Sequence, residues 1–166
     1  MTDALVLTAK AWESLTAAGK AAVATVERHI MALCGGREDV AGHLLDYLAF
    51  CVQRPGRKIR YSPVIVGVEG DGKTAIGELL ARVMGEVNIK VLEPRILTES
   101  PFTGWARNAC VCVVEELRMQ GRNRHEALNA LKPLVSNATV AIHAKGFDPI
   151  DAPNVMNFIA LTNFKD

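Results

Sequence analysis

The chain has 166 residues, of which 49% are hydrophobic and 22% charged, the composition of an ordinary folded domain. Its formal net charge of +1 at pH 7 argues against a protein that coats polyanions over its whole surface, so any contact with nucleic acid has to be local. No apolar run reaches the length of a bilayer span and the N-terminus lacks a signal-peptide pattern, so we expect a cytoplasmic protein without a membrane partner.

Residues 1–56 are predicted to form an N-terminal helical segment ahead of a core formed by residues 57–166. Hydrophobic side chains repeat at helical spacing over Ala9–Cys34 and again over Glu38–Gln53. We expect these two helices to pack together as a small cap. The basic connection that follows contains Arg54, Arg57, Lys58 and Arg60 and is expected to be solvated, as most charge clusters in loops are. Contact with a nucleotide base, a neighbouring subunit or nucleic acid is the alternative.

The clearest motif is VIVGVEGDGKT, residues 64–74. An apolar strand runs into a glycine-rich stretch that ends in Lys73 and Thr74, matching the pattern G-x-x-x-x-G-K-[ST] of phosphate-binding loops. Glycines let the backbone curl tightly and point several N–H groups at phosphates. A chance glycine-rich turn is the weaker alternative, because a strand precedes the motif and a predicted helix, Ala75–Met84, follows it.

The motif predicts an ATP and Mg²⁺ site. We expect Lys73 to reach the β- and γ-phosphates, and the Thr74 hydroxyl to hold Mg²⁺. The helix that starts at Ala75 directs the positive end of its dipole at the phosphates. The residues expected to contact the nucleotide are Gly67, Gly70, Asp71, Gly72, Lys73, Thr74 and Ala75.

The next part of the chain is less informative. Val87–Leu92 is predicted as a second strand, and the prolines and glycine between residues 94 and 104 leave no clear period. Trp105 either stacks on a base or joins the loop to the core, and the second interpretation is the commoner one for such a residue.

A continuous apolar strand is predicted over Ala109–Val114, followed directly by Glu115 and Glu116. Downstream of a phosphate loop, such an acid pair brings one carboxylate to Mg²⁺ and a second to the attacking water. We assign Glu115 to the metal, through water, and Glu116 to the water nucleophile, although the two roles can be exchanged. The alternative is a surface acidic pair that opens the next helix. Cys110 and Cys112 lack a second ligand pair and are expected to be core thiols rather than zinc ligands.

The C-terminal part changes from a helical period to an alternating one. A helix over Gly121–Val135 is followed by the alternating stretch Thr139–Lys145 and by turn residues, which predicts a β-hairpin with Lys145 and Phe147 near its tip. A last apolar strand, Phe158–Leu161, leads into Asn163, whose amide is expected to bond the γ-phosphate or the attacking water.

Together these motifs resemble the motor domain of superfamily 3 helicases of the phage and prophage primase-helicase type. The resemblance begins near Glu38 and reaches the C-terminus. It is carried by the phosphate loop Gly67–Thr74, the pair Glu115-Glu116, the segment Leu131–Pro149 and the polar stop Thr162-Asn163. It implies an α/β fold with an AAA+-like parallel sheet flanked by helices, an N-terminal helical cap and a β-hairpin before the last strand.

The resemblance also implies function. Members form rings, usually hexamers, bind ATP between subunits and move along single-stranded DNA, with a fused or separate primase. Lys145 matches the basic hairpin position that grips DNA phosphates, and His143 and Phe147 are further candidates. A lysine on a flexible stem suits contact with a phosphate backbone without reading its sequence. An ordinary solvated turn lysine is the alternative for Lys145.

One feature of the family, the arginine finger, has no counterpart in this sequence. No position after Asn163 matches the arginine finger, and the sheet is expected to lack the family's final strand. We therefore expect weak ATP hydrolysis by the isolated chain. Two other functions stay open: a non-catalytic ATP-binding switch or assembly module, and a phosphate-loop kinase whose lid carries Arg118, Arg122 and Arg124.

Overall fold

The computed structural model describes residues 11–116 and 122–163, and the chain divides into two compact units with a boundary between Leu45 and Asp46. In the first unit, helix α2 (Ala17–Leu33) begins after Thr16, whose backbone is extended and whose hydroxyl accepts a hydrogen bond from Gly19 N at 3.1 Å. The prediction of one continuous helix from residue 9 was therefore wrong, because this N-cap starts a new helix. In the described residues, no helix combines the length and the apolar character needed to cross a bilayer.

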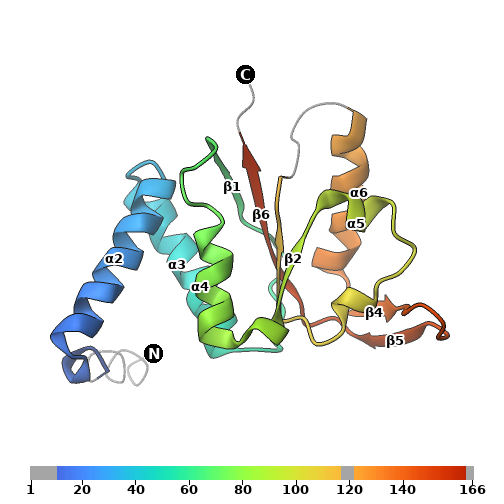
Figure 1. The fold of residues 1–166 in the computed structure, drawn as a ribbon, viewed down its shortest axis with the longest axis horizontal. Helices are drawn as coiled ribbons and strands as arrows, with labels where there is room; N and C mark the ends of the chain where they lie inside the picture. Colours follow the sequence, from blue (N-terminus) through green and yellow to red (C-terminus); the bar gives the residue numbers. More distant parts are fainter. Residues whose placement is uncertain (1–10, 117–121, 164–166) are drawn as a thin grey trace. The chain divides into compact units, whose positions relative to one another are not determined.

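The second unit contains a four-stranded parallel sheet, as predicted (Figure 1). Its strands lie in the order β1 (Val64–Gly67), β6 (Asn157–Asn163), β3 (Val111–Val114) and β2 (Ile89–Leu92). Its helices are the end of α3 (Glu38–Gln53), α4 (Ala75–Met84), α5 (Pro94–Thr98) and α6 (Arg122–Ser136), with single 3₁₀ turns at Glu86–Asn88 and Gly104–Ala106. Helix α4 lies on one side of the sheet, and α5 and α6 lie on the other.

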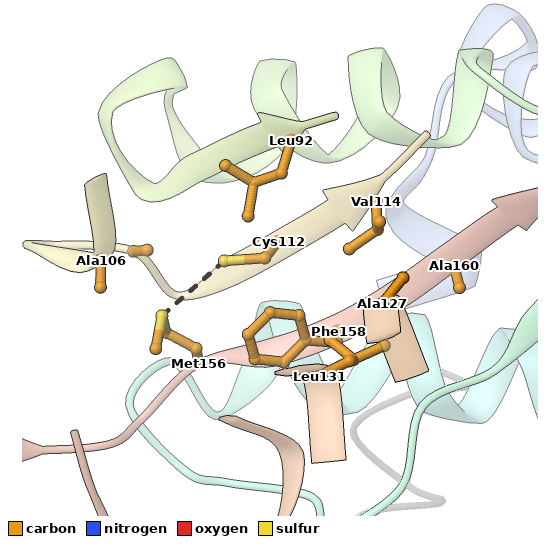
Figure 2. Close-up of a cluster of buried hydrophobic side chains, with 10 residues drawn as sticks. Leu92, Ala106, Cys112, Val114, Ala127, Leu131, Met156, Phe158 and Ala160 are labelled. Carbon is orange, nitrogen blue, oxygen red and sulfur yellow. Dashed lines mark hydrogen bonds between the residues drawn. The ribbon is translucent and has the colours of Figure 1, made fainter. Parts of the chain in front are cut away.

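Strand β3, one of the two inner strands of the sheet, is buried on both faces, which explains why its sequence is apolar at every position. On one face, Val113 approaches Gly77 of α4, where an added Cβ would lie 3.5 Å from the valine side chain. On the other face, Cys112 and Val114 belong to a hydrophobic cluster that also includes Leu131 of α6. Figure 2 shows this cluster, in which the Cys112 and Met156 sulfur atoms are 3.8 Å apart.

A lysine in the connection before β1 is an exception to the expected solvation. Lys58 Nζ donates hydrogen bonds to the carbonyl oxygens of Leu134 and Met156, both at 2.8 Å, and lies over the Phe158 ring. Burial lowers the pKa of Lys58 to about 8. Because Leu134 is in the last turn of α6, its carbonyl lacks a helical partner, and Lys58 Nζ and Asn154 Nδ2 both donate to it.

The predicted hairpin is present as an antiparallel pair, β4 (Thr139–Ile142) and β5 (Ile150–Pro153). Strand β4 ends at Ile142, before the predicted end at Lys145. Lys145 lies in the exposed turn, and the Phe147 side chain there is 74% exposed. The turn end of the hairpin is attached to the loop before β3, because Thr103 N donates to His143 O at 3.0 Å and His143 N donates to Thr103 Oγ1 at 2.9 Å.

Other boundaries also differ from the predictions. Strand β2 starts at Ile89, because the residues after Gly85 form a 3₁₀ turn that leaves Val87 60% exposed. The short helix α5 was not predicted. Trp105 packs against the core cluster, which is the commoner of its two predicted roles.

Candidate nucleotide-binding site

The carboxyl ends of three neighbouring strands meet at one edge of the sheet. Gly67 at the end of β1 is paired in register with Asn163 at the end of β6. Val114 at the end of β3 is paired with Ala160, and the next residue, Glu115, donates its backbone N–H to Leu92 O at 3.0 Å. In open α/β sheets, ligands bind at this edge.

A cleft of about 360 Å³ opens at this edge. Its described lining contains the distal part of the phosphate loop, the acid pair and the end of β6. The lining residues are Glu69, Gly70, Asp71, Gly72, Lys73, Thr74, Glu115, Glu116, Leu161, Thr162 and Asn163. Of the residues predicted for this site, only Gly67 and Ala75 lie outside the lining, as the last residue of β1 and the first of α4. The prediction omitted Glu69, Leu161 and Thr162.

The phosphate loop depends on its glycines. Gly70 and Gly72 have φ angles of 82° and 86°, a region that other residues rarely adopt. The loop leads into α4, whose N-cap residue Thr74 makes no side-chain capping hydrogen bond and is exposed. The Thr74 hydroxyl therefore has no structural role in the cap that would compete with metal binding.

Lys73 is the buried cation of the cleft, with 6% of its surface exposed. Its Nζ donates hydrogen bonds to Val68 O at 2.6 Å and to Asp71 Oδ1 at 2.8 Å. The lysine is thus held inside the loop rather than extended into solvent, which fixes its charge at the phosphate loop.

The two glutamates differ in their surroundings. Glu115 is half-buried, whereas Glu116 is exposed and has a φ angle of 54°, in the left-handed region. A non-glycine residue in this conformation carries a backbone cost and is often found at functional sites. Glu116 also lines a neighbouring cavity of about 430 Å³, so it lies at the boundary between that cavity and the cleft.

The described lining of the cleft contains four carboxylates, those of Glu69, Asp71, Glu115 and Glu116, and one lysine. Such a site favours a cation that accompanies an anionic ligand. In the residues that the structure describes, no group of three His, Cys, Asp or Glu side chains can hold a metal by itself.

The three predicted DNA-binding residues lie on the hairpin, away from the lining of the cleft. Lys145 and Phe147 are exposed at its tip, while His143, directly after β4, has its ring 5.0 Å from the Phe102 ring. The arginines predicted for the lid of the alternative kinase are not located, because Arg118 and the side chains of Arg122 and Arg124 lie outside the described residues.

Comparison with solved structures supports the fold. An apo structure of the NrS-1 C-terminal region (305–718) matches with a TM-score of 0.75 and 22% identity, over 83% of this chain and 33% of that chain. Two A-form apo structures of this region match with TM-scores of 0.72 and 0.69, each at 21% identity. They cover 83% and 84% of this chain and 32% and 31% of theirs. The chain thus spans about a third of the length of these structures.

No curated protein matches the chain. A family model described as "Family of unknown function (DUF5906)" matches residues 65–166, which include the phosphate loop, the acid pair, the hairpin and the last strand. The chain therefore belongs to the DUF5906 family.

Proposed function

We propose that residues 57–166 form the ATP-binding and ATP-hydrolysing motor of a superfamily 3 DNA helicase that moves along single-stranded DNA as a ring. The observation that carries the proposal is a cleft lined jointly by Lys73, Glu116 and Asn163. These residues come from three separate segments of the chain, and a simple nucleotide-binding turn does not need all three.

In this proposal each group has a defined task. Lys73 exchanges its loop contacts for the β- and γ-phosphates, and Thr74 and Glu115 hold Mg²⁺, which neutralises phosphate charge when bound. Glu116 accepts a proton from the attacking water, and the Asn163 amide orients that water or the γ-phosphate. The exposed position of Glu116 leaves its carboxylate accessible to solvent.

The proposal includes assembly as a ring. In it, Lys73 supplies one cation to the transition state, and an arginine finger from a neighbouring subunit, worth several orders of magnitude in rate, would supply a second. The second candidate function is a non-catalytic ATP-binding module, which would use the same phosphate loop and Lys73 without hydrolysis.

The hairpin supplies the proposed DNA contact. Its tip presents the ammonium of Lys145 and the exposed ring of Phe147, a cation for phosphates and an apolar face for a base. At the end of β4, His143 is bonded to Thr103, in the connection that leads from α5 to β3 and the acid pair. A continuous part of the chain therefore joins the proposed DNA contact to the proposed catalytic residues.

The proposal is tested by measuring MgATP binding by calorimetry and ATP turnover with and without single-stranded DNA. We expect saturable MgATP binding that Lys73→Ala removes, and turnover that rises with protein concentration and with DNA. MgATP binding without ATP turnover under every condition, including with a longer form of the protein, would exclude the motor and favour the non-catalytic module. Phosphate transfer to an added acceptor would instead identify a kinase.

A further inference from the structure

The phosphate loop contains a carboxylate bonded to its own lysine. Asp71 Oδ1 accepts hydrogen bonds from Lys73 Nζ at 2.8 Å and from Lys73 N at 3.1 Å. The two side chains are shielded, with exposed fractions of 22% for Asp71 and 6% for Lys73. Ion pairs shielded from water are screened less than surface pairs, so this contact competes effectively with other anions for the lysine.

The pair lies against the first glycine of the loop. A Cβ added to Gly67 would come within 1.9 Å of Asp71 Oδ2 and 3.4 Å of Lys73 Nζ. The absence of a side chain at Gly67 therefore leaves room for the carboxylate inside the loop. Asp71 and Lys73 also line the cleft, so a phosphate that reaches Lys73 meets the carboxylate.

We infer that Asp71 is an internal competitor that ATP must displace from Lys73, and that it makes nucleotide binding depend on Mg²⁺. This inference rests on the proposed function of the cleft. Displacing the carboxylate costs one charge-assisted hydrogen bond, and the displaced carboxylate then repels the incoming phosphates. Mg²⁺ on the triphosphate reduces that repulsion, so Asp71 disfavours metal-free ATP more than MgATP.

A purely structural role for Asp71 makes a different prediction. If its main task were to order the loop by accepting the Lys73 backbone N–H, losing that acceptor would weaken nucleotide binding. Asp71→Asn keeps an oxygen acceptor of nearly the same shape and removes only the charge. The asparagine variant therefore separates competition for the lysine from support of the loop.

The experiment is a calorimetric titration of the wild-type chain, Asp71→Asn and Glu86→Gln with MgATP and with ATP in EDTA. Glu86 is exposed in the 3₁₀ turn after α4, outside the described lining of the cleft, and its substitution makes the same change in charge, which makes it the matched control. We expect Asp71→Asn to bind MgATP about ten- to a hundredfold more tightly, the effect of removing one charge-assisted hydrogen bond from the free protein. The gain should be larger for metal-free ATP, and Glu86→Gln should stay within about twofold of wild type.

Several results would overturn the inference. Unchanged or weaker MgATP binding by Asp71→Asn would show that the carboxylate does not compete, and an equal gain in Glu86→Gln would reduce the effect to overall charge. Asp71→Ala also removes the carboxylate, and we expect it to bind MgATP more tightly than the wild type as well. A thermal melt of each variant checks that it is folded. If the wild type binds MgATP through Lys73 and Asp71→Asn gains nothing, only this inference fails. If neither protein binds at millimolar MgATP, the proposed function fails with it.

Discussion

Two lysines lie in glycine-containing turns at different places in the second unit, and their surroundings differ sharply. Lys73 is almost fully buried and makes two hydrogen bonds within the phosphate loop, whereas Lys145 is exposed at the hairpin tip. A lysine that is held in place suits a ligand with one bound geometry, such as a triphosphate. A solvated lysine on a flexible stem suits a polymer that has to slide past. The contrast indicates separate tasks for the two turns.

The largest expected effect comes from removing the buried lysine. Lys73→Ala should weaken MgATP binding by at least about a hundredfold, because the alanine variant cannot donate charge-assisted hydrogen bonds to the β- and γ-phosphates. Calorimetry measures this effect, and Lys145→Ala is the matched control with unchanged MgATP affinity. Comparable losses of MgATP affinity in both variants would remove the distinction between the two lysines.

The second largest effect is expected on ATP turnover and tests whether the cleft hydrolyses ATP. Glu116→Gln should lower ATP turnover by about 10²- to 10⁴-fold, the usual contribution of a general base, and should leave MgATP affinity unchanged. A coupled phosphate-release assay in the presence of single-stranded DNA measures turnover. If Glu115→Gln shows the pure turnover defect and Glu116→Gln does not, the roles of the two glutamates are exchanged.

A smaller effect is expected at the hairpin. Lys145→Ala should weaken binding to single-stranded DNA and reduce the salt dependence, with the slope of log K against log salt falling by about 0.7 for each DNA phosphate that the variant no longer neutralises. Fluorescence anisotropy at several salt concentrations gives both quantities. Lys132→Ala, which removes an exposed lysine bonded only locally to Asn129, is the control. Equal DNA binding by the Lys145 and Lys132 variants would exclude Lys145 from the DNA site.

The smallest effect concerns a third lysine, whose environment lies between the other two. Burial holds the pKa of Lys58 at about 8 in the folded chain, below its ordinary value of 10.5. Between these pH values the unfolded chain binds more protons at this site, so the contribution of Lys58 to the free energy of unfolding rises with pH. Thermal melts of the wild type and Lys58→Met from pH 7 to 10 should show their stability difference change in favour of the wild type above pH 8. A pH-independent difference would contradict the lowered pKa.

The sequence predicted the parts of the site that are set by local chemistry. Gly72 has a positive φ angle that explains why the motif requires glycine there, and β3 is buried on both faces as its apolar run implied. The order of motifs along the chain was sufficient to place Glu115 and Asn163 at one edge of a parallel sheet.

Contacts between segments that are distant in the sequence could not be predicted from local sequence patterns. Lys58 was expected to be solvated with the rest of its charge cluster, yet its partners lie 76 and 98 residues later in the chain. Helix α5 has only five residues and begins at a proline, so it is too short to show a hydrophobic period. Asp71 was recognised as part of the loop, but its bond to Lys73 depends on how the loop curls.

The most direct test of the central claim is a structure determined with Mg²⁺ and a non-hydrolysable ATP analogue. The account predicts the γ-phosphate within hydrogen-bonding distance of Lys73 Nζ, Mg²⁺ on the Thr74 hydroxyl, and the Asp71 carboxylate displaced from the lysine. A nucleotide bound elsewhere, or one in the cleft with the Asp71 to Lys73 bond still intact at 2.8 Å, would contradict it.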